Sequence, residues 1–314
     1  MLPPTTTPGR KNPVAILEQV INGLLLGGTY SLLAIGYTLV FGVLRLLNMA
    51  HGETLMLSSF VGVFVALVSG RNDLGILVVS FGVAVLVGAA LGLVIERLAF
   101  YPLRHAHELA PLISTLGIGV FLEEFAFTWS RKSSYLQPDI TGFHNLLEFA
   151  GWNLGPLYIR ASYLTVCEVA AVLMVGLHVW VRRTRMGRAI RAVAENPMAA
   201  QFMGVDVERA IVITFVLSSA LAGAAGMLIA TADSTIYPAM GRYATLTGLV
   251  VMVIGGMGNV VGAMIGGLIF GVLQTTAGYL WSTSYRDIVA FGLLILFLVI
   301  RPQGLFGSPA LKRS

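Results

Sequence analysis

Three polar side chains, Asn48, His51 and Glu53, lie close together in the segment 42–57 (GVLRLLNMAHGETLML), which is otherwise apolar enough for a membrane. Ionisable groups at membrane depth are costly, and those that occur commonly mark a transport pathway or a partner site. The competing interpretation is a short interfacial loop that holds these side chains at headgroup level. One histidine and one glutamate are too few for a zinc site. We therefore name all three as candidate pathway residues and expect no metal.

A glycine-rich interruption provides the second group of candidates. The residues Gly255, Gly256 and Gly258 divide the apolar stretch 246–274. In membrane transporters, broken helices expose backbone groups to a cavity, and helix N-termini favour an anionic carboxylate. The alternative is close helix packing without any contact to a substrate. We name these three glycines as further candidate pathway residues.

The sequence lacks the motifs of nucleotide binding and hydrolysis. A phosphate-binding loop of the form GxxxxGK[ST] needs a lysine after its glycines. The three lysines, Lys11, Lys132 and Lys312, follow no such glycine run. No HExxH motif or nucleophile elbow occurs, and Cys167 is the only cysteine. We therefore expect a protein that is not an enzyme and has no catalytic residue, cofactor or metal site.

A long basic loop, residues 182–209, carries six arginines against three acidic residues. Within it, Asn196 can cap a helix, Pro197 suits the first helical position, and Gly204 suits the C-terminal stop. These signals predict a two-turn helix over 197–203. A helix of this length is not stable alone in water, because nucleation costs more than a few hydrogen bonds return. Other parts of the chain or a partner must therefore hold it.

The predicted short helix has one apolar face, because Ala199, Phe202 and Met203 fall at positions i, i+3 and i+4. Apolar surface on a marginal helix implies that something covers it. One interpretation is that the face packs on membrane helices of the same chain. The other, which we favour, is that it docks into a cytoplasmic partner.

The elements that position these residues are membrane helices. Of the 314 residues, 56% are hydrophobic and only 11% are charged, which is less than half of the ~25% charge of soluble domains. Unbroken apolar runs, rather than alternation, favour helices over a closed barrel. Small residues spaced by four predict close approach of helix backbones. Such pairs are Gly23/Gly27, Gly88/Gly92, Gly262/Gly266 and Gly267/Gly271.

We predict an all-α, polytopic transmembrane bundle of about eight to nine membrane helices, one or two of them discontinuous. The stretch 245–281 is too long for one ordinary span, and we expect a short half-helix followed by a full one. The transmembrane domain covers 13–307, between a disordered tail at 1–12 and a cytoplasmic tail at 308–314. The predicted spans are 14–44, 53–69, 75–96, 110–129, 162–181, 210–231, 245–281 and 287–300.

The distribution of Lys and Arg predicts the orientation, because cytoplasmic loops carry the excess of these residues. Basic loops are therefore placed inside, and loops near charge balance are placed outside. Strict alternation then leaves Arg10 and Lys11 outside, unless the chain breaks inside the membrane around 45–52. The inside segments are 97–108, 182–209 and the tail after residue 300, and the outside segments are 130–161 and 232–244.

With these clusters the sequence resembles the permease family of branched-chain amino acid ABC transporters, and the resemblance runs over nearly the whole chain. Several separate motifs occur in the family's order, which makes the set more specific than any single motif. The matching segments are INGLLLGGTYSLLAIGYTLVFGVLRLLNMAHGE (21–53), IERLAFYPLR (95–104), RMGRAIRAVAENPMAAQFMGV (185–205), GGMGNVVGAMIGGLIFG (255–271) and RPQGLFG (301–307).

The resemblance implies a permease subunit of an ATP-driven importer for Leu, Ile and Val in the bacterial inner membrane. Its partners by the same analogy are a second related permease, two ABC ATPase subunits that bind ATP and magnesium, a periplasmic substrate-binding protein and membrane lipid, with no nucleic acid. The basic loop then resembles the segment that meets the ATPase. The residues assigned to this coupling are Arg188, Glu195, Ala199, Ala200, Phe202, Gly204 and Val205.

Three alternatives remain at this point. The segment NMAHGE (48–53) also occurs in the similar permeases for urea and short amides, so another small polar solute is the first. The second is an ion-coupled transporter that works alone and could use Glu123 or Glu124 in the fourth span. It would be expected to show an inverted internal repeat, and no convincing repeat is present. The third is a membrane scaffold without a pathway, which the broken helices and the docking helix disfavour.

Overall fold

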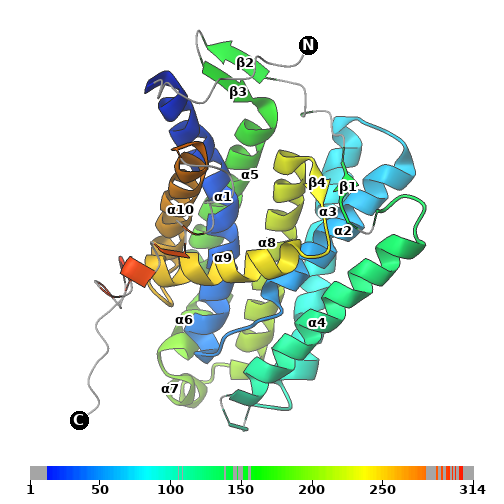
Figure 1. Ribbon diagram of the computed structural model, residues 1–314. Helices are drawn as coiled ribbons and strands as arrows, with labels where there is room; N and C mark the ends of the chain where they lie inside the picture. The colour runs from blue at the N-terminus through cyan, green and yellow to red at the C-terminus, as the bar shows by residue number, and fades with distance from the viewer. Residues whose placement is uncertain are drawn as a thin grey trace.

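The described part of the chain is a bundle of long helices with two short β ladders at one end (Figure 1). Seven of its helices are long and apolar enough to cross a membrane. The prediction of an all-α polytopic bundle is confirmed, although it did not include the strands. The tails at 1–12 and 308–314 and half of the span at 287–300 lie outside the described residues. The computed structural model describes residues 13–104, 106–107, 109–137, 139–143, 147, 151–154, 157–280, 288, 291–292, 295–297, 299, 301 and 304–306.

Seven long helices run along the bundle, and the remaining elements are short. The helices are α1 Pro13–Leu44, α2 His51–Ser69, α3 Leu74–Ile95, the π-helical turn η1 Glu96–Phe100, α4 Leu109–Lys132, α5 Ala161–Arg183, α6 Arg185–Glu195, α7 Pro197–Phe202, α8 Val207–Asp233, α9 Met240–Gly255 and α10 Val260–Leu280. The strands are β1 Thr141–Gly142, β2 Gly151–Leu154, β3 Leu157–Arg160 and β4 Thr235–Ile236.

The loops separate into two ends, as their charges predict. We call one end the basic end. There Arg97 of η1 donates a hydrogen bond of 2.9 Å to Glu208, which lies at the start of α8. The helices α6 and α7 lie at the same end. At the other end, which we call the strand end, the antiparallel pair β1–β4 joins segment 130–161 to segment 232–244. The predicted grouping is therefore confirmed for segments 97–108 and 182–209 at one end and 130–161 and 232–244 at the other. The placement of the tail after residue 300 stays a prediction. The positive-inside rule assigns the basic end to the cytoplasm.

The path of α1 fixes the direction of the chain. This helix begins at the strand end, in contact with β3, and runs as 32 unbroken residues to the basic end. Arg45 then has a left-handed φ of 55°, and α2 starts at His51 and returns to the strand end. The break expected around 45–52 is present, but the chain reverses there, so it does not bring the start of α1 to the basic end. Arg10 and Lys11 lie outside the described residues.

Glycines let the long helices approach closely. A Cβ added to Gly27 on α1 would lie 2.7 Å from the Cα of Leu268 on α10. A Cβ added to Gly92 on α3 would lie 2.6 Å from the carbonyl oxygen of Phe215 on α8. Larger side chains would force these helices apart, so the predicted small-residue packing is confirmed. The glycines at these two crossings include Gly23, Gly27, Gly88, Gly92, Gly223, Gly267 and Gly271.

We expect Gly27→Leu to destabilise the protein, because overpacking of a tight contact costs about 1–3 kcal/mol. Gly176→Leu on α5 is the matched control, since nothing lies within 4 Å of a Cβ at that position. The measurement is the unfolding midpoint and the monodisperse yield of each variant in detergent. Equal midpoints for the two variants would contradict the α1–α10 contact.

Candidate functional site

The short helix α9 shapes the centre of the bundle. It has 16 residues and runs across α1 rather than along it (Figure 1). At its C-terminal end, Gly256 has a φ of 104° and Gly258 a φ of 84°, conformations that residues with a Cβ rarely adopt. The chain then enters α10. The predicted half-helix followed by a full helix is therefore confirmed.

The glycines at this break make close backbone contacts. A Cβ on Gly255 would lie 2.5 Å from the carbonyl carbon of Gly262 on α10. Phe306 closes over the break and donates its backbone N–H to the carbonyl of Gly255 at 3.2 Å. Gly256 is also buried, whereas Gly258 is exposed. These contacts correspond to the helix-packing alternative, and the pathway role of the three glycines stays a prediction.

The polar group predicted at 48–53 lies inside the bundle. Asn48, His51 and Glu53 are all buried within the bundle, and their depth in the membrane stays a prediction. His51 packs edge-on against Tyr37 of α1, with ring centroids 4.5 Å apart. A Cβ on Gly36 would lie 2.7 Å from the Cε1 atom of His51. The group therefore forms a tight polar contact between α1 and the first turn of α2, and its part in a pathway stays a prediction.

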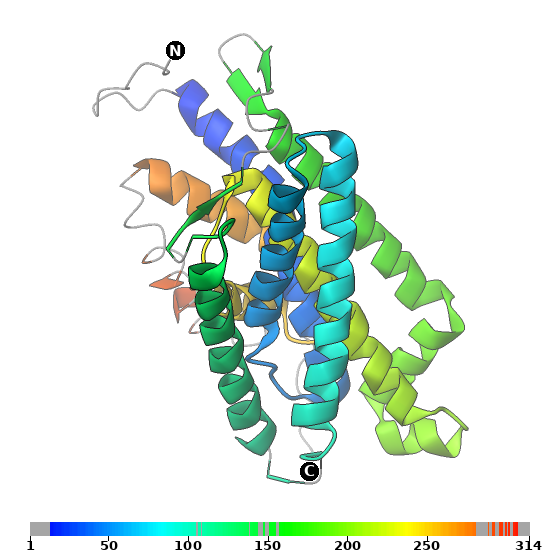
Figure 2. The same ribbon diagram turned by 90° about the vertical axis from the view of Figure 1, so that its right-hand side faces the viewer.

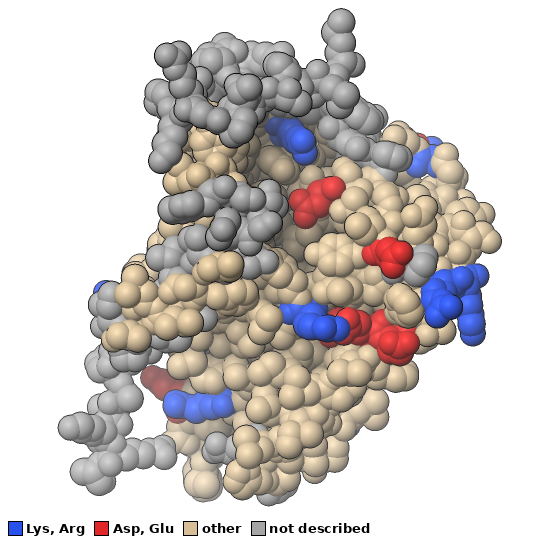
Figure 3. Space-filling view, viewed as in Figure 1, with Lys and Arg blue, Asp and Glu red and all other residues tan. Residues whose placement is uncertain are grey.

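Charged side chains meet near the middle of α4. Arg242, in the first turn of α9, donates to Glu123 of α4 at 2.5 Å. Glu53 of α2 is adjacent, since a Cβ on Gly241 would lie 2.6 Å from its carboxyl carbon. The side chain of Arg242 is 70% exposed, and Glu124 is exposed as well. In the coloured part of Figure 3, a small group of positive and negative side chains lies near the centre of a largely uncharged face.

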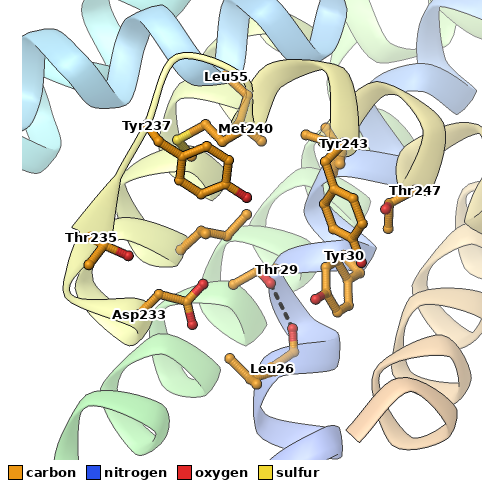
Figure 4. A pocket seen from close by; sticks show the side chains of 13 residues that line it. Leu26, Thr29, Tyr30, Leu55, Asp233, Thr235, Tyr237, Met240, Tyr243 and Thr247 are labelled. Atoms are coloured by element: carbon orange, nitrogen blue, oxygen red, sulfur yellow. Dashed lines mark hydrogen bonds between the residues drawn. The ribbon is translucent and has the colours of Figure 1, made fainter. Parts of the chain in front are cut away.

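A cavity of about 280 Å³ lies between α9 and β4 (Figure 4). Two of its walls are single helical faces with the spacing i, i+3, i+4 and i+7, and α2, α8, β4 and Tyr237 complete the lining. None of the six candidate pathway residues lines it. The repeated spacing on two helices is the sequence signal that could have found it. The face of α1 presents Leu26, Thr29, Tyr30 and Leu33, and that of α9 presents Met240, Tyr243, Ala244 and Thr247.

At the basic end, two short helices follow one another. The side chain of Thr184 caps α6 by accepting the N–H of Gly187 at 3.0 Å. Asn196 caps α7 by accepting the N–H of Ala199 at 3.0 Å, and Gly204 ends it with a φ of 79°. The short helix predicted from Asn196 and Gly204 is therefore confirmed. The helix α6, which carries several of the arginines, was not predicted.

The two sides of α7 have different surroundings. Ala200 is buried in an apolar cluster that includes Phe215 of α8, and this contact holds the helix against the bundle. On the other side, Met198, Phe202 and Met203 are 69%, 84% and 83% exposed. The apolar face therefore does not pack on the described helices of its own chain, and the first of the two interpretations is wrong.

The remaining residues assigned to coupling lie around the same surface. Arg188, Glu195 and Ala199 are exposed. Val205 is half-buried and donates its backbone N–H to the carbonyl of Ala200 at 3.0 Å. All seven residues thus lie on α6, α7 and the turn that follows. Their contact with an ATPase stays a prediction.

Known proteins resemble the chain over nearly its whole length. The family model described as "Branched-chain amino acid transport system / permease component" matches residues 19–298. The high-affinity branched-chain amino acid transport system permease protein LivH of Escherichia coli (strain K12) is 36% identical, covering 95% of this chain and 97% of its own. BraD of Pseudomonas aeruginosa, of the same description, is 34% identical with the same coverage. A probable LivH of Methanocaldococcus jannaschii is 30% identical over 88% of both chains.

Proposed function

Since the chain belongs to the family of permease components of branched-chain amino acid transport systems, we propose that it forms part of the membrane pathway of an ATP-driven importer for leucine, isoleucine and valine. It is a multi-pass inner-membrane protein and a transport subunit. The three relatives described above are all named for branched-chain amino acids. The alternative of urea or short amides is therefore not favoured. A transporter that works alone is not favoured either, because the family is described as a component of a transport system.

The uncovered apolar side of α7 carries this proposal. Phe202, the last residue of this six-residue helix, and Met203, which follows it, expose most of their surface. Exposed apolar surface of this kind marks an interaction site, and a short helix inserted into a groove is a common mode of recognition. The occupant we propose is an ATPase subunit, which would bind the ATP and magnesium. The arginines of α6, such as Arg188, would meet acidic groups on the rim of that groove.

The contacts of α7 would transmit a displacement of this helix to the membrane-spanning helices. Ala200 lies in an apolar cluster that also contains residues of α8, and Asn196 alone separates α7 from α6. A displacement of α7 by closing ATPases would therefore act on α8, which runs to the strand end. The ATPases can switch the permease only by binding its two states with different affinity. A substrate-binding protein would dock at the strand end.

The Glu123–Arg242 pair supports a second permease as partner. An ionised side chain at the centre of a membrane helix costs about 2.5–3.5 kcal/mol, and Arg242 is largely exposed on this chain. A second permease chain that covers α4 and the start of α9 would surround Arg242 with protein and water instead of lipid. We therefore assign the face shown in Figure 3 to that partner.

We expect Phe202→Glu to lower the ATPase activity that the binding protein stimulates by at least tenfold, because a charge would have to enter an apolar groove, and hot-spot losses reach about 2 kcal/mol or more. Gly204→Pro should act in the same direction. Proline cannot adopt a φ of 79°, and it removes the N–H that Gly204 donates to Gln201.

Both variants should still insert into the membrane and assemble with the second permease. Gln201→Glu is the matched control, since it adds the same charge to an exposed polar position of α7. Unchanged stimulated ATP turnover in Phe202→Glu would refute the coupling assignment.

The second-permease face predicts a crosslinking pattern. A benzophenone amino acid in place of Glu124 should crosslink to the second permease in intact membranes. The same residue in place of Val172 should not, because Val172 is exposed on α5, on the opposite side of the bundle from α4 (Figure 2). Capture of the second permease from position 172 with none from position 124 would contradict this face.

A further inference from the structure

The cavity between α9 and β4 has an apolar part and a polar part. Leu26 and Leu33 of α1, Leu55 of α2 and Ile229 of α8 provide aliphatic surface. Hydroxyl groups of threonine and tyrosine line much of the remainder, together with one carboxylate, that of Asp233. No lysine, arginine or histidine is among the lining residues that the structure describes. The volume of about 280 Å³ lies at the small end of ligand pockets.

Two helix ends of opposite polarity meet at this cavity. Asp233 is the last residue of α8, and helix C-termini carry partial negative charge that favours cations. Met240 and Tyr243, in the first turn of α9, also line the cavity, and helix N-termini offer N–H donors and partial positive charge to anions. The cavity therefore favours a cation on one side and an anion on the other.

The side chains agree with this polarity. In Figure 4 the carboxylate of Asp233 and the hydroxyl of Tyr237 point into the cavity from different walls. Thr247 of α9 lines the same space, and its buried hydroxyl has no hydrogen-bond partner in the described structure. A buried hydroxyl without a partner is costly, and a ligand oxygen in the cavity would supply the missing bond.

We propose that this cavity is the subsite at which the permease itself holds a zwitterionic amino acid with an aliphatic side chain. The ammonium lies on Asp233 and the C-terminal end of α8, and the carboxylate lies on the first turns of α9 near Thr247. The aliphatic side chain packs against the leucines of α1. This assignment rests on the proposed function and makes the permease, as well as the binding protein, selective against neutral solutes such as urea.

Asp233→Asn in the reconstituted complex tests the ammonium contact. At saturating leucine-loaded binding protein, leucine uptake should fall at least tenfold, while stimulation of the ATPase stays within twofold. Asp233→Glu should restore part of the uptake. The matched control is Asp73→Asn, which removes an exposed charge at the same end but keeps a residue able to cap α3.

Undiminished uptake in Asp233→Asn would overturn the proposal. So would a loss of uptake with an equal loss of ATPase stimulation, because that pattern indicates a docking contact for the binding protein. Failure of the unmodified complex to import leucine would instead refute the proposed function.

Cysteine protection tests the site directly. In a Cys167→Ser background, Tyr237→Cys provides a thiol at the cavity, and a polar thiol reagent should label it more slowly in the presence of leucine. The analogues 3-methylbutylamine, which keeps the ammonium, and 4-methylpentanoate, which keeps the carboxylate, should each slow labelling, because each retains one of the two polar contacts. Adding Asp233→Asn should abolish the effect of the amine. Absence of protection by leucine, or protection by the amine that Asp233→Asn leaves unchanged, would overturn the subsite.

Discussion

Hydrocarbon offers no partners for backbone hydrogen bonds, so a membrane helix can be interrupted only where the protein itself supplies them. The break after α1 meets this requirement because Thr115 of α4 accepts the N–H of Met49, at 3.2 Å. At the break after α9, the side chain of Asn259 accepts the N–H of Gly262 and donates to the carbonyl of Phe306, both at 3.0 Å. These side chains permit a short helix to lie across the bundle.

The course of α9 across the bundle places the features that the proposed transport would use. A helix parallel to α1 would carry its N-terminus away from the cavity, whereas the start of α9 and the end of α8 line the cavity together. The same helix start brings Arg242 to Glu123 near the middle of α4. Its continuation leads through the glycine break into α10, which packs on α1 through Gly27. One interrupted helix thus positions the cavity, the charged face and a tight helix contact.

The helix α8 joins the two ends of the molecule. It begins beside α7 and ends at Asp233 in the cavity wall, 27 residues later, which is about 40 Å at 1.5 Å per residue. Its contact with α3 is tight, because glycines such as Gly92 leave no room between the backbones. Under the proposed coupling, a displacement at the basic end would act on this tightly packed helix rather than on a flexible loop.

The sequence predicted those features whose causes are local. The cap and the stop of α7 lie within nine residues, from Asn196 to Gly204. The break at Gly255 is likewise predicted by a short run of glycines. The pairing of Arg242 with Glu123 joins residues 119 positions apart, so spacing along the chain carries no sign of it. The crossing angle of α9 and the β1–β4 ladder depend on such distant contacts as well. The helical spacing of the cavity walls was readable in the sequence, but only the structure shows that these two faces meet.

The most direct test of the account is leucine uptake into proteoliposomes assembled with and without the ATPase subunits. If α7 passes movement from a separate ATPase to α8, the complete complex with its binding protein and ATP accumulates leucine, and the permease alone does not. Accumulation of leucine against its gradient by the isolated chain, with no ATPase present, would contradict the account.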